Sequence, residues 1–351
     1  MATKMYRATV ASVRAIYGNR LRPQHYRAMI SLHTVPDIAA YLKQTDAYRN
    51  LLADMEPSVM HRGYLESVLQ RTVFQQYLHF CKLEQLHNTP FFRFIIMDYE
   101  IRELLKAILL LPQHKSGSYI SQMHGWLSPY TVFSLEKLAQ AKSYAEILEV
   151  TRHTVYYNCL KPFLAQEDGD FPYFACEIAL RAGYVQHLLD ETQRMMKGKN
   201  RDALTSLIRE QVDLINLINA YRLKSVFHSD SETLHSLMLP IQGLLPKRVC
   251  TALYDAPDTE SFRQILSRTR YGHMLEPEGT LSHHRQMEHS FQILRCRTAR
   301  NALRFSDHAL VSLYAVHHLH RVEVDNLKTI IEGIRYDQPA AYLESLIIMN
   351  I

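Results

Sequence analysis

The stretch that decides the fold is HRVEVDNLKTIIEGIRYD, residues 320–337. Glu323, Asn326 and Ile330 are spaced by three and four residues, so a helix places them on one face. A carboxylate and an amide on a mostly apolar face need hydrogen-bond partners if they are buried. These partners could be basic side chains of a neighbouring helix or the N–H groups at a helix N-terminus. The stretch therefore predicts either an active-site acid or a polar contact that fixes a helix crossing.

The same pattern occurs three times along the chain: an acid, an aliphatic residue, any residue, Asn or Glu, and then Leu. The copies are Glu100-Ile-Arg-Glu-Leu104, Asp213-Leu-Ile-Asn-Leu217 and Glu323-Val-Asp-Asn-Leu327. Each follows a glutamate in a helical segment by 34, 36 and 35 residues, and these glutamates are Glu66, Glu177 and Glu288. The glutamates are 111 residues apart, which predicts a module written three times.

Two further signposts recur in the same order. A Leu-x-Pro opens each unit, at Leu21-Arg-Pro23, Leu127-Ser-Pro129 and Leu244-Leu-Pro246. Because proline is tolerated in the first helical turn, each predicts a helix start. A short helix ending in Leu-x-x-Thr follows, at Thr45, Thr151 and Thr269. We predict three helical domains, residues 1–117, 118–233 and 234–351, with boundaries in the polar stretches 112–119 and 227–235.

Composition favours an all-α fold. The 351 residues are 47% apolar and include only 11 Gly and 13 Pro, and no apolar/polar alternation suggests strands. Forty basic residues are scattered among 35 acidic ones, which argues against a nucleic-acid partner. The five cysteines form no CxxC and are expected to be buried thiols of a cytosolic protein. The sequence has neither a signal peptide nor an apolar run long enough to span a bilayer, so a soluble protein is expected.

No residue is predicted to be catalytic, to bind a cofactor or to bind a metal. A catalytic site needs one set of different roles, whereas an acid repeated at three equivalent places is expected to be framework. Three related acids could still meet on an internal three-fold axis and bind a cation. The histidine clusters do not match HExxH, although a metal-dependent hydrolase that uses them stays open as an alternative; they are His283, His284, His289, His317, His318 and His320.

Arg297, Arg300 and Arg304 fall on one side of a predicted helix. This side is expected to be solvated. The alternative is that it contacts an acidic partner or lipid head groups at a membrane surface.

The triplicate acid motif, followed by Lys or Arg, resembles the C-subunit family of V/A-type ATPases, equivalent to the d-subunit of the eukaryotic vacuolar enzyme. The resemblance covers nearly the whole chain and is strongest in DLINLINAYRLK, residues 213–224, and EVDNLKTIIEGIR, residues 323–335. The first copy departs from the pattern, because Glu100 and Glu103 replace Asp and Asn and the stretch AILLLPQ, residues 107–113, lacks the expected Arg or Lys. The matching positions are Glu100, Leu104, Asp213, Asn216, Leu217, Arg222, Lys224, Glu323, Asn326, Leu327 and Arg335.

The resemblance implies a pseudo-three-fold funnel of three helical domains that has no active site, cofactor or small-molecule substrate. It implies a peripheral position at the cytoplasmic face of a membrane. There the funnel would join the central shaft of a rotary ATPase to the membrane rotor ring and couple ATP hydrolysis or synthesis to proton or sodium transport. A generic helical-repeat scaffold that binds a soluble protein partner is the alternative.

Overall fold

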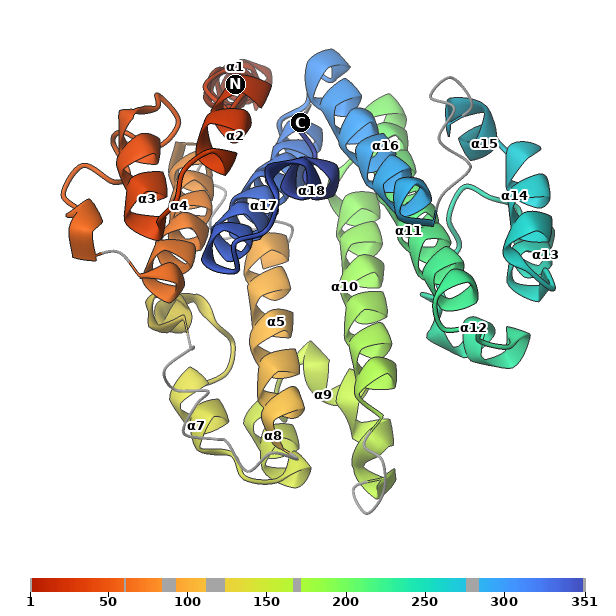
Figure 1. Cartoon of the computed structure of the whole chain (residues 1–351). Coiled ribbons are helices and arrows are strands. Elements are labelled where there is room, and N and C mark those ends of the chain that lie inside the picture. Colours follow the sequence, from red (N-terminus) through yellow and green to blue (C-terminus); the bar gives the residue numbers. More distant parts are fainter. Residues whose placement is uncertain are drawn as a thin grey trace. The chain divides into compact units, whose positions relative to one another are not determined.

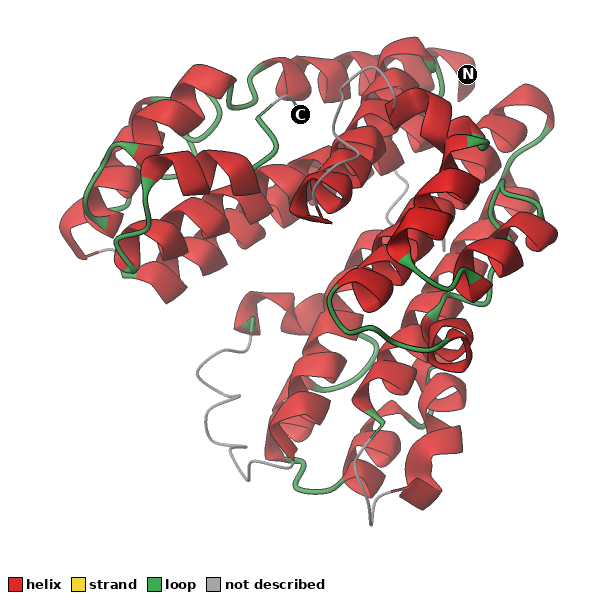
Figure 2. Cartoon of the chain, turned by 45° about the vertical axis from the view of Figure 1, so that its right-hand side comes forward, coloured by secondary structure: helices red, strands yellow, loops and turns green. Residues whose placement is uncertain are grey.

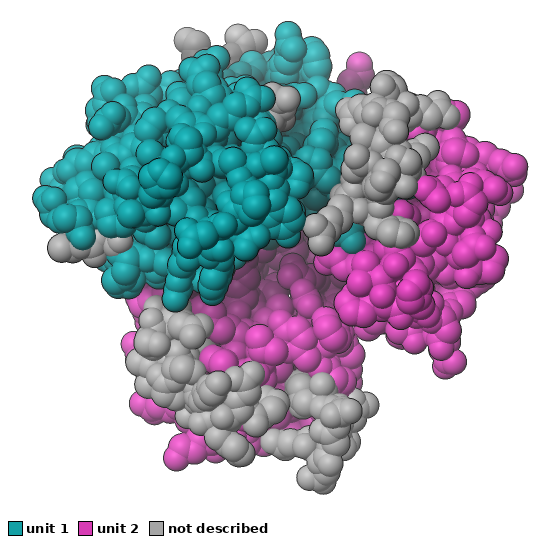
Figure 3. Space-filling model, viewed as in Figure 1, with its two compact units in different colours: residues 1–88, 285–351 teal, residues 89–284 magenta. Residues whose placement is uncertain are grey.

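The computed structural model describes residues 2–59, 61–83, 93–111, 124–166, 172–275 and 284–349. Every regular element in these ranges is a helix, so the predicted all-α fold is confirmed (Figure 1, Figure 2). Contacts divide the chain into two compact units: residues 1–88 with 285–351, and residues 89–284 (Figure 3). Over the described ranges, none of the helices has the length and apolar character needed to cross a bilayer.

The discontinuous unit is organised around α17, which packs against α1, α2, α3, α4 and α18. This central position explains why α17 buries apolar residues along its whole length, from Leu310 to Ile334. The unit therefore joins the two ends of the described chain. Its helices are α1 (Ala2–Gly18), α2 (Pro23–Ile30), α3 (Val35–Gln44), η1 (Pro57–Val59), α4 (Arg62–Leu83), α16 (His284–Phe305), α17 (Ala309–Arg335) and α18 (Ala340–Leu346).

The continuous unit contains the long helices α10 and α11, which pack against each other. Helix α10 also packs on α5, α9 and α12, and α11 packs on α12 and α14. The helices are α5 (Phe94–Leu110), η5 (Gly125–Tyr130), α7 (Leu135–Gln140), α8 (Tyr144–Thr151), α9 (Val155–Leu160), η6 (Lys161–Gln166), α10 (Tyr173–Met195), α11 (Gly198–Ser225), α12 (Ser231–Leu237), α13 (Lys247–Asp255), α14 (Thr259–Ser267) and α15 (Arg270–Leu275).

The predicted order of long helices is confirmed. Glu66, Glu177 and Glu288 lie on α4, α10 and α16, and the three acid motifs lie on α5, α11 and α17. The short helices that end in Leu-x-x-Thr are α3, α8 and α14. Each begins at a side-chain N-cap that accepts a hydrogen bond from a backbone N–H in the first turn. The caps are Thr34, Ser143 and Asp258.

The prediction that each Leu-x-Pro starts a helix is correct at Pro23, the first residue of α2, and one residue early at Pro246, the N-cap of α13. It is wrong at Pro129, which lies inside the short 3-10 helix η5. The next helix, α7, begins where the Ser134 hydroxyl accepts the N–H of Lys137, so a polar cap sets this start.

The candidate domain boundary at 112–119 lies outside the described residues. The boundary at 227–235 covers the turn between α11 and α12 and also the first five residues of α12, so this stretch is partly helical. The division into three domains stays a prediction.

The free cysteines are less uniformly buried than predicted. Cys176 and Cys296 are buried, whereas Cys159 and Cys250 are half-buried. The side chain of Cys81 lies outside the described part of the chain.

Candidate functional site

Glu323 lies on α17 with only 6% of its surface exposed. Its Oε2 accepts the N–H of Leu21, just before α2, at 2.9 Å. Its Oε1 accepts the hydroxyl of Tyr48, just after α3, at 2.8 Å. One buried carboxylate therefore ties the central helix to both sides of the α2–α3 pair.

Asp213 makes the same kind of contact from α11. Its Oδ2 accepts the N–H of Leu244 at 2.7 Å, the N–H of Leu245 at 2.9 Å and the hydroxyl of Tyr271 at 2.8 Å. The backbone of Gly243 approaches so closely that a Cβ there would collide with the carboxylate. This glycine was not singled out in the sequence, and the close approach requires a residue without a side chain.

Glu100 is the third copy, on α5, and it is fully buried. Its Oε1 accepts the N–H of Val132 at 2.7 Å, and its Oε2 accepts the hydroxyl of Tyr156 at 2.6 Å. Arg93 adds a charge-assisted hydrogen bond to each oxygen at 3.1 Å. The donor Val132 precedes α7, so this copy binds the segment before α7 and not the Leu-Ser-Pro stretch inside η5.

The three carboxylates thus occupy one recurring environment, a backbone N–H before a short helix and a tyrosine hydroxyl after the Leu-x-x-Thr helix. Each threonine hydroxyl donates to the carbonyl of the leucine three residues earlier, which closes the end of that helix. The tyrosines were missed at the level of the sequence. A tyrosine two to five residues after each threonine was the available signal; these residues are Tyr48, Tyr156 and Tyr271.

Burial shifts the pKa of Asp213, of Glu323 and of the three tyrosines. Burial raises the pKa of Asp213 above its ordinary value, and the hydrogen bonds from Tyr271, Leu245 and Leu244 oppose that rise. Burial likewise raises the pKa of Glu323, opposed by the hydrogen bonds from Tyr48 and Leu21. Burial and the neighbouring carboxylate raise the pKa of each tyrosine, so the phenols stay protonated and act as donors.

The asparagine of the motif forms a second buried contact. Asn216 donates to the carbonyl of Leu239 at 3.2 Å and accepts its N–H at 2.9 Å. Asn326 makes the same pair of bonds with Ile348, at 2.7 and 2.9 Å. An amide can donate and accept together, so it satisfies both backbone groups of one residue.

The first copy has Glu103 at this position, and a carboxylate cannot donate when ionised. Glu103 is buried and contacts Nδ1 of His124 at 2.7 Å and Nζ of Lys106 at 3.1 Å. Replacing the asparagine of the motif with Glu103 therefore exchanges a backbone N–H and carbonyl for two side chains as its partners.

The remaining motif residues occupy other places in the fold. Leu104, Leu217 and Leu327 are core residues. The Lys224 ammonium is buried and donates to the carbonyl of Ala256. Arg222 and Arg335 are exposed on the last turns of α11 and α17.

The predicted arginine side of α16 is only partly exposed. Arg297 and Arg300 are half-buried, whereas Arg304 is exposed at the C-terminal end and lies 5.5 Å from the ring of Phe305. Of the three, Arg304 is the best placed to meet a partner.

The histidines do not form a metal cluster within the described part of the chain. His283 and the side chain of His284 fall outside it. Burial lowers the pKa of His320 to about 4, so this ring is neutral at pH 7. It lines a cavity of about 190 Å³ beside Tyr48 and Glu323.

The fold and the buried contacts together define a class of protein. It is an all-α framework in which buried carboxylates and amides on long helices bind backbone groups next to short helices. The chain belongs to the ATP synthase (C/AC39) subunit family, whose model matches residues 9–345. The resemblance recognised in the sequence is therefore confirmed at the level of the family.

The chain is similar to the C-subunit of A-type ATP synthase from three archaea. For Methanosarcina barkeri the identity is 22% over 280 residues, covering 77% of this chain and 71% of the relative. For Methanosarcina mazei it is 23% over 274 residues, covering 76% and 71%. For Thermococcus onnurineus it is 22% over 231 residues, covering 66% and 60%.

Proposed function

We propose that this chain is a non-catalytic connector of a V/A-type rotary ATPase, which joins the central shaft to the membrane rotor ring. The observation that carries the proposal is the family match over residues 9–345. In this role the protein couples ATP hydrolysis or synthesis to proton or sodium transport and sits peripherally at the cytoplasmic face of the membrane.

The buried polar contacts support this role. A connector that transmits torque needs stiff elements whose crossings do not slip. The helices α11 and α17 have 28 and 27 residues, and each is held in its unit by a buried acid and a buried asparagine. Satisfied buried hydrogen bonds rigidify a helix crossing, because breaking them leaves polar groups unpaired.

Exposed apolar side chains at helix ends offer surface that an assembly could cover. Phe227 follows α11 and is 64% exposed, Phe305 ends α16 and is 75% exposed, and Tyr336 follows α17 and is 60% exposed. In each case a basic residue lies nearby in the sequence, as Arg304 does beside Phe305. We assign these ends to contacts with the shaft or the ring.

We also propose that the chain is a threefold repeat with bounds 1–117, 118–233 and 234–351, arranged as a funnel with approximate three-fold symmetry. The recurring carboxylate environment supports the repeat. With these bounds, the acid of each repeat binds the following repeat, and the acid of the third binds the first. An experimental structure in which the three sets of helices superpose would test the arrangement.

Affinity purification of the tagged chain from its native host tests the connector role. We expect the shaft and ring subunits of a V/A-type ATPase to co-purify and the isolated chain to lack ATPase activity. Recovery of a stable complex without any membrane component would instead support a scaffold for a soluble partner. Failure to recover any rotary-ATPase subunit would reject the connector.

A charge reversal tests the partner-facing arginine. Arg304→Glu should reduce the amount of co-purified complex. Arg152→Glu is the matched control, because Arg152, which directly follows α8, is also exposed and forms an ion pair with Glu149 of that helix. Equal recovery with both variants would show that Arg304 faces solvent in the assembly.

A further inference from the structure

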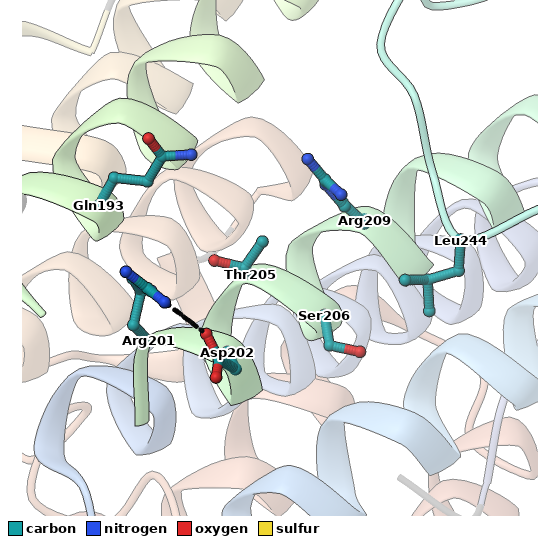
Figure 4. A pocket seen from close by; sticks show the side chains of 7 residues that line it. All are labelled: Gln193, Arg201, Asp202, Thr205, Ser206, Arg209 and Leu244. Atoms are coloured by element: carbon teal, nitrogen blue, oxygen red, sulfur yellow. Dashed lines mark hydrogen bonds and ion pairs between the residues drawn. The ribbon is translucent and has the colours of Figure 1, made fainter. Parts of the chain in front are cut away.

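A polar pocket of about 470 Å³ lies between the C-terminal part of α10 and the first turns of α11 (Figure 4). Arg201, Thr205 and Arg209 are spaced by four residues, so they share one side of α11. Gln193 of α10 faces them, and Leu244, which precedes α13, closes one end. The volume falls in the range of small-molecule sites, roughly 300–1,000 Å³.

Arg209 is the distinctive residue of this pocket. Its side chain is half-buried, and its Nε is fully buried without a hydrogen-bond acceptor among the described residues. A buried donor of a charged group is costly to leave unpaired. A ligand in the pocket cannot reach this buried Nε, but it can reach the terminal nitrogens of Arg209, which are not buried and have no hydrogen-bond or ion-pair partner among the described residues.

The other lining groups are suited to an oxyanion. The hydroxyls of Thr205 and Ser206 and the amide of Gln193 can all donate hydrogen bonds. The one acid, Asp202, is exposed and is bound through Oδ1 by Nε and Nη2 of Arg201, at 3.2 and 3.1 Å. In Figure 4, Asp202 lies on the opposite side of Thr205 from Arg209 and Gln193.

We propose that this pocket binds a phosphate group, with Arg209 as its main anchor. The guanidinium fork matches the geometry of a phosphate and binds it through charge-assisted hydrogen bonds. Since phosphate alone leaves much of the volume unfilled, the ligand is a phosphate ester with an organic part. The site lies within the continuous unit, and it does not depend on the connector role.

The pocket is linked to the carboxylate of α11. Leu244 lines the pocket with its side chain and donates its N–H to Asp213. A ligand that contacts Leu244 therefore also holds the segment that Asp213 binds, so phosphate should slow hydrogen exchange at the amides of Leu244 and Leu245.

Titration calorimetry of the purified chain with inorganic phosphate, at constant ionic strength set with sodium chloride, tests the proposal. We expect one phosphate bound per chain and at least about tenfold weaker binding by Arg209→Gln. Arg152→Gln, an exposed arginine outside the pocket, is the control and should bind as the wild type does.

A second variant keeps the test decisive if Arg209→Gln does not fold. Thr205→Glu places a carboxylate four residues before Arg209, where it can form a helix ion pair. It should abolish phosphate binding while the melting temperature without phosphate stays at or above that of the wild type. Wild-type affinity in this folded variant would overturn the proposal.

Vesicles distinguish the source of the phosphate group. Binding to phosphatidylglycerol vesicles, but not to phosphatidylcholine vesicles, that is lost in Thr205→Glu would identify a lipid head group as the source. Binding of soluble phosphate without vesicle binding would identify a soluble ester. A wild-type chain that responds to neither would refute the site.

Discussion

Replacing Asp213 with alanine should destabilise the continuous unit by about 2–4 kcal/mol. The change removes the acceptor for two N–H groups and one hydroxyl. Leu245 and Tyr271 are buried, and each buried donor left unpaired costs about 1–3 kcal/mol, whereas the half-buried Leu244 N–H can turn to water. Removing the charge also relieves the desolvation that raises the pKa of Asp213, which offsets part of the loss.

Urea unfolding followed by fluorescence measures this loss, because the single tryptophan, Trp126, lies in the continuous unit. Hydrogen exchange at the amides of Leu244 and Leu245 should accelerate in parallel. Glu149→Ala is the control, since this acid is exposed on α8, and it should change the unfolding free energy by less than about 0.5 kcal/mol.

A double-mutant cycle isolates the hydrogen bond between Tyr271 and Asp213 from the other contacts of these residues. Tyr271→Phe should cost about 1–2 kcal/mol, and the double variant with Asp213→Ala should lose less than the sum of the two. If Asp213→Ala costs less than about 0.5 kcal/mol and leaves the amides of Leu244 and Leu245 protected from exchange, the carboxylate does not hold this segment on α11 and the reasoning fails.

Three further outcomes are expected. Gly243→Ala should cost about 1–3 kcal/mol in urea unfolding, because the new Cβ collides with the acid of α11, whereas Gly125→Ala, in open space, should be near neutral. Asn326→Ala should cost about 2–3 kcal/mol and expose the amide of Ile348 to exchange, because both backbone groups of that residue lose their partner. The raised pKa of Glu323 means that the folded chain holds this proton more tightly, so its contribution to stability is complete below the unfolded pKa and is lost as the pH rises through the folded pKa. The unfolding free energy of the wild type relative to Glu323→Gln should therefore fall with rising pH, and parallel profiles would contradict this.

The sequence predicts the helices and the repeated acids well, because both appear as regular spacings of residues along the chain. Helical spacing placed Glu323 and Asn326 on one face, and both are buried together. The near-constant intervals identified three copies without any contact being known. These features depend on periodicity along the chain, which a single sequence contains.

The partners of the acids were harder to predict, because they are distant in sequence. Leu21 binds a carboxylate 302 residues away, and it does so through its backbone, which carries no sequence signal. Tyr48 was recognisable only by its position after Thr45. Leu127-Ser-Pro129 shows that a sequence match can also mislead. This triplet matches the other two, but it lies in a 3-10 helix, and the next α-helix begins further on, at the N-cap Ser134.

The discontinuous unit also constrains how this protein is made. Residues 1–88 leave the ribosome first. The helix that they pack around, α17, is synthesised only after the whole of 89–284. At roughly 5–20 residues per second, the early helices wait on the order of ten to forty seconds with their apolar faces uncovered. Nascent chains halted within that interval should recruit holdase chaperones, which would release them once Glu323 has emerged to engage Leu21 and Tyr48.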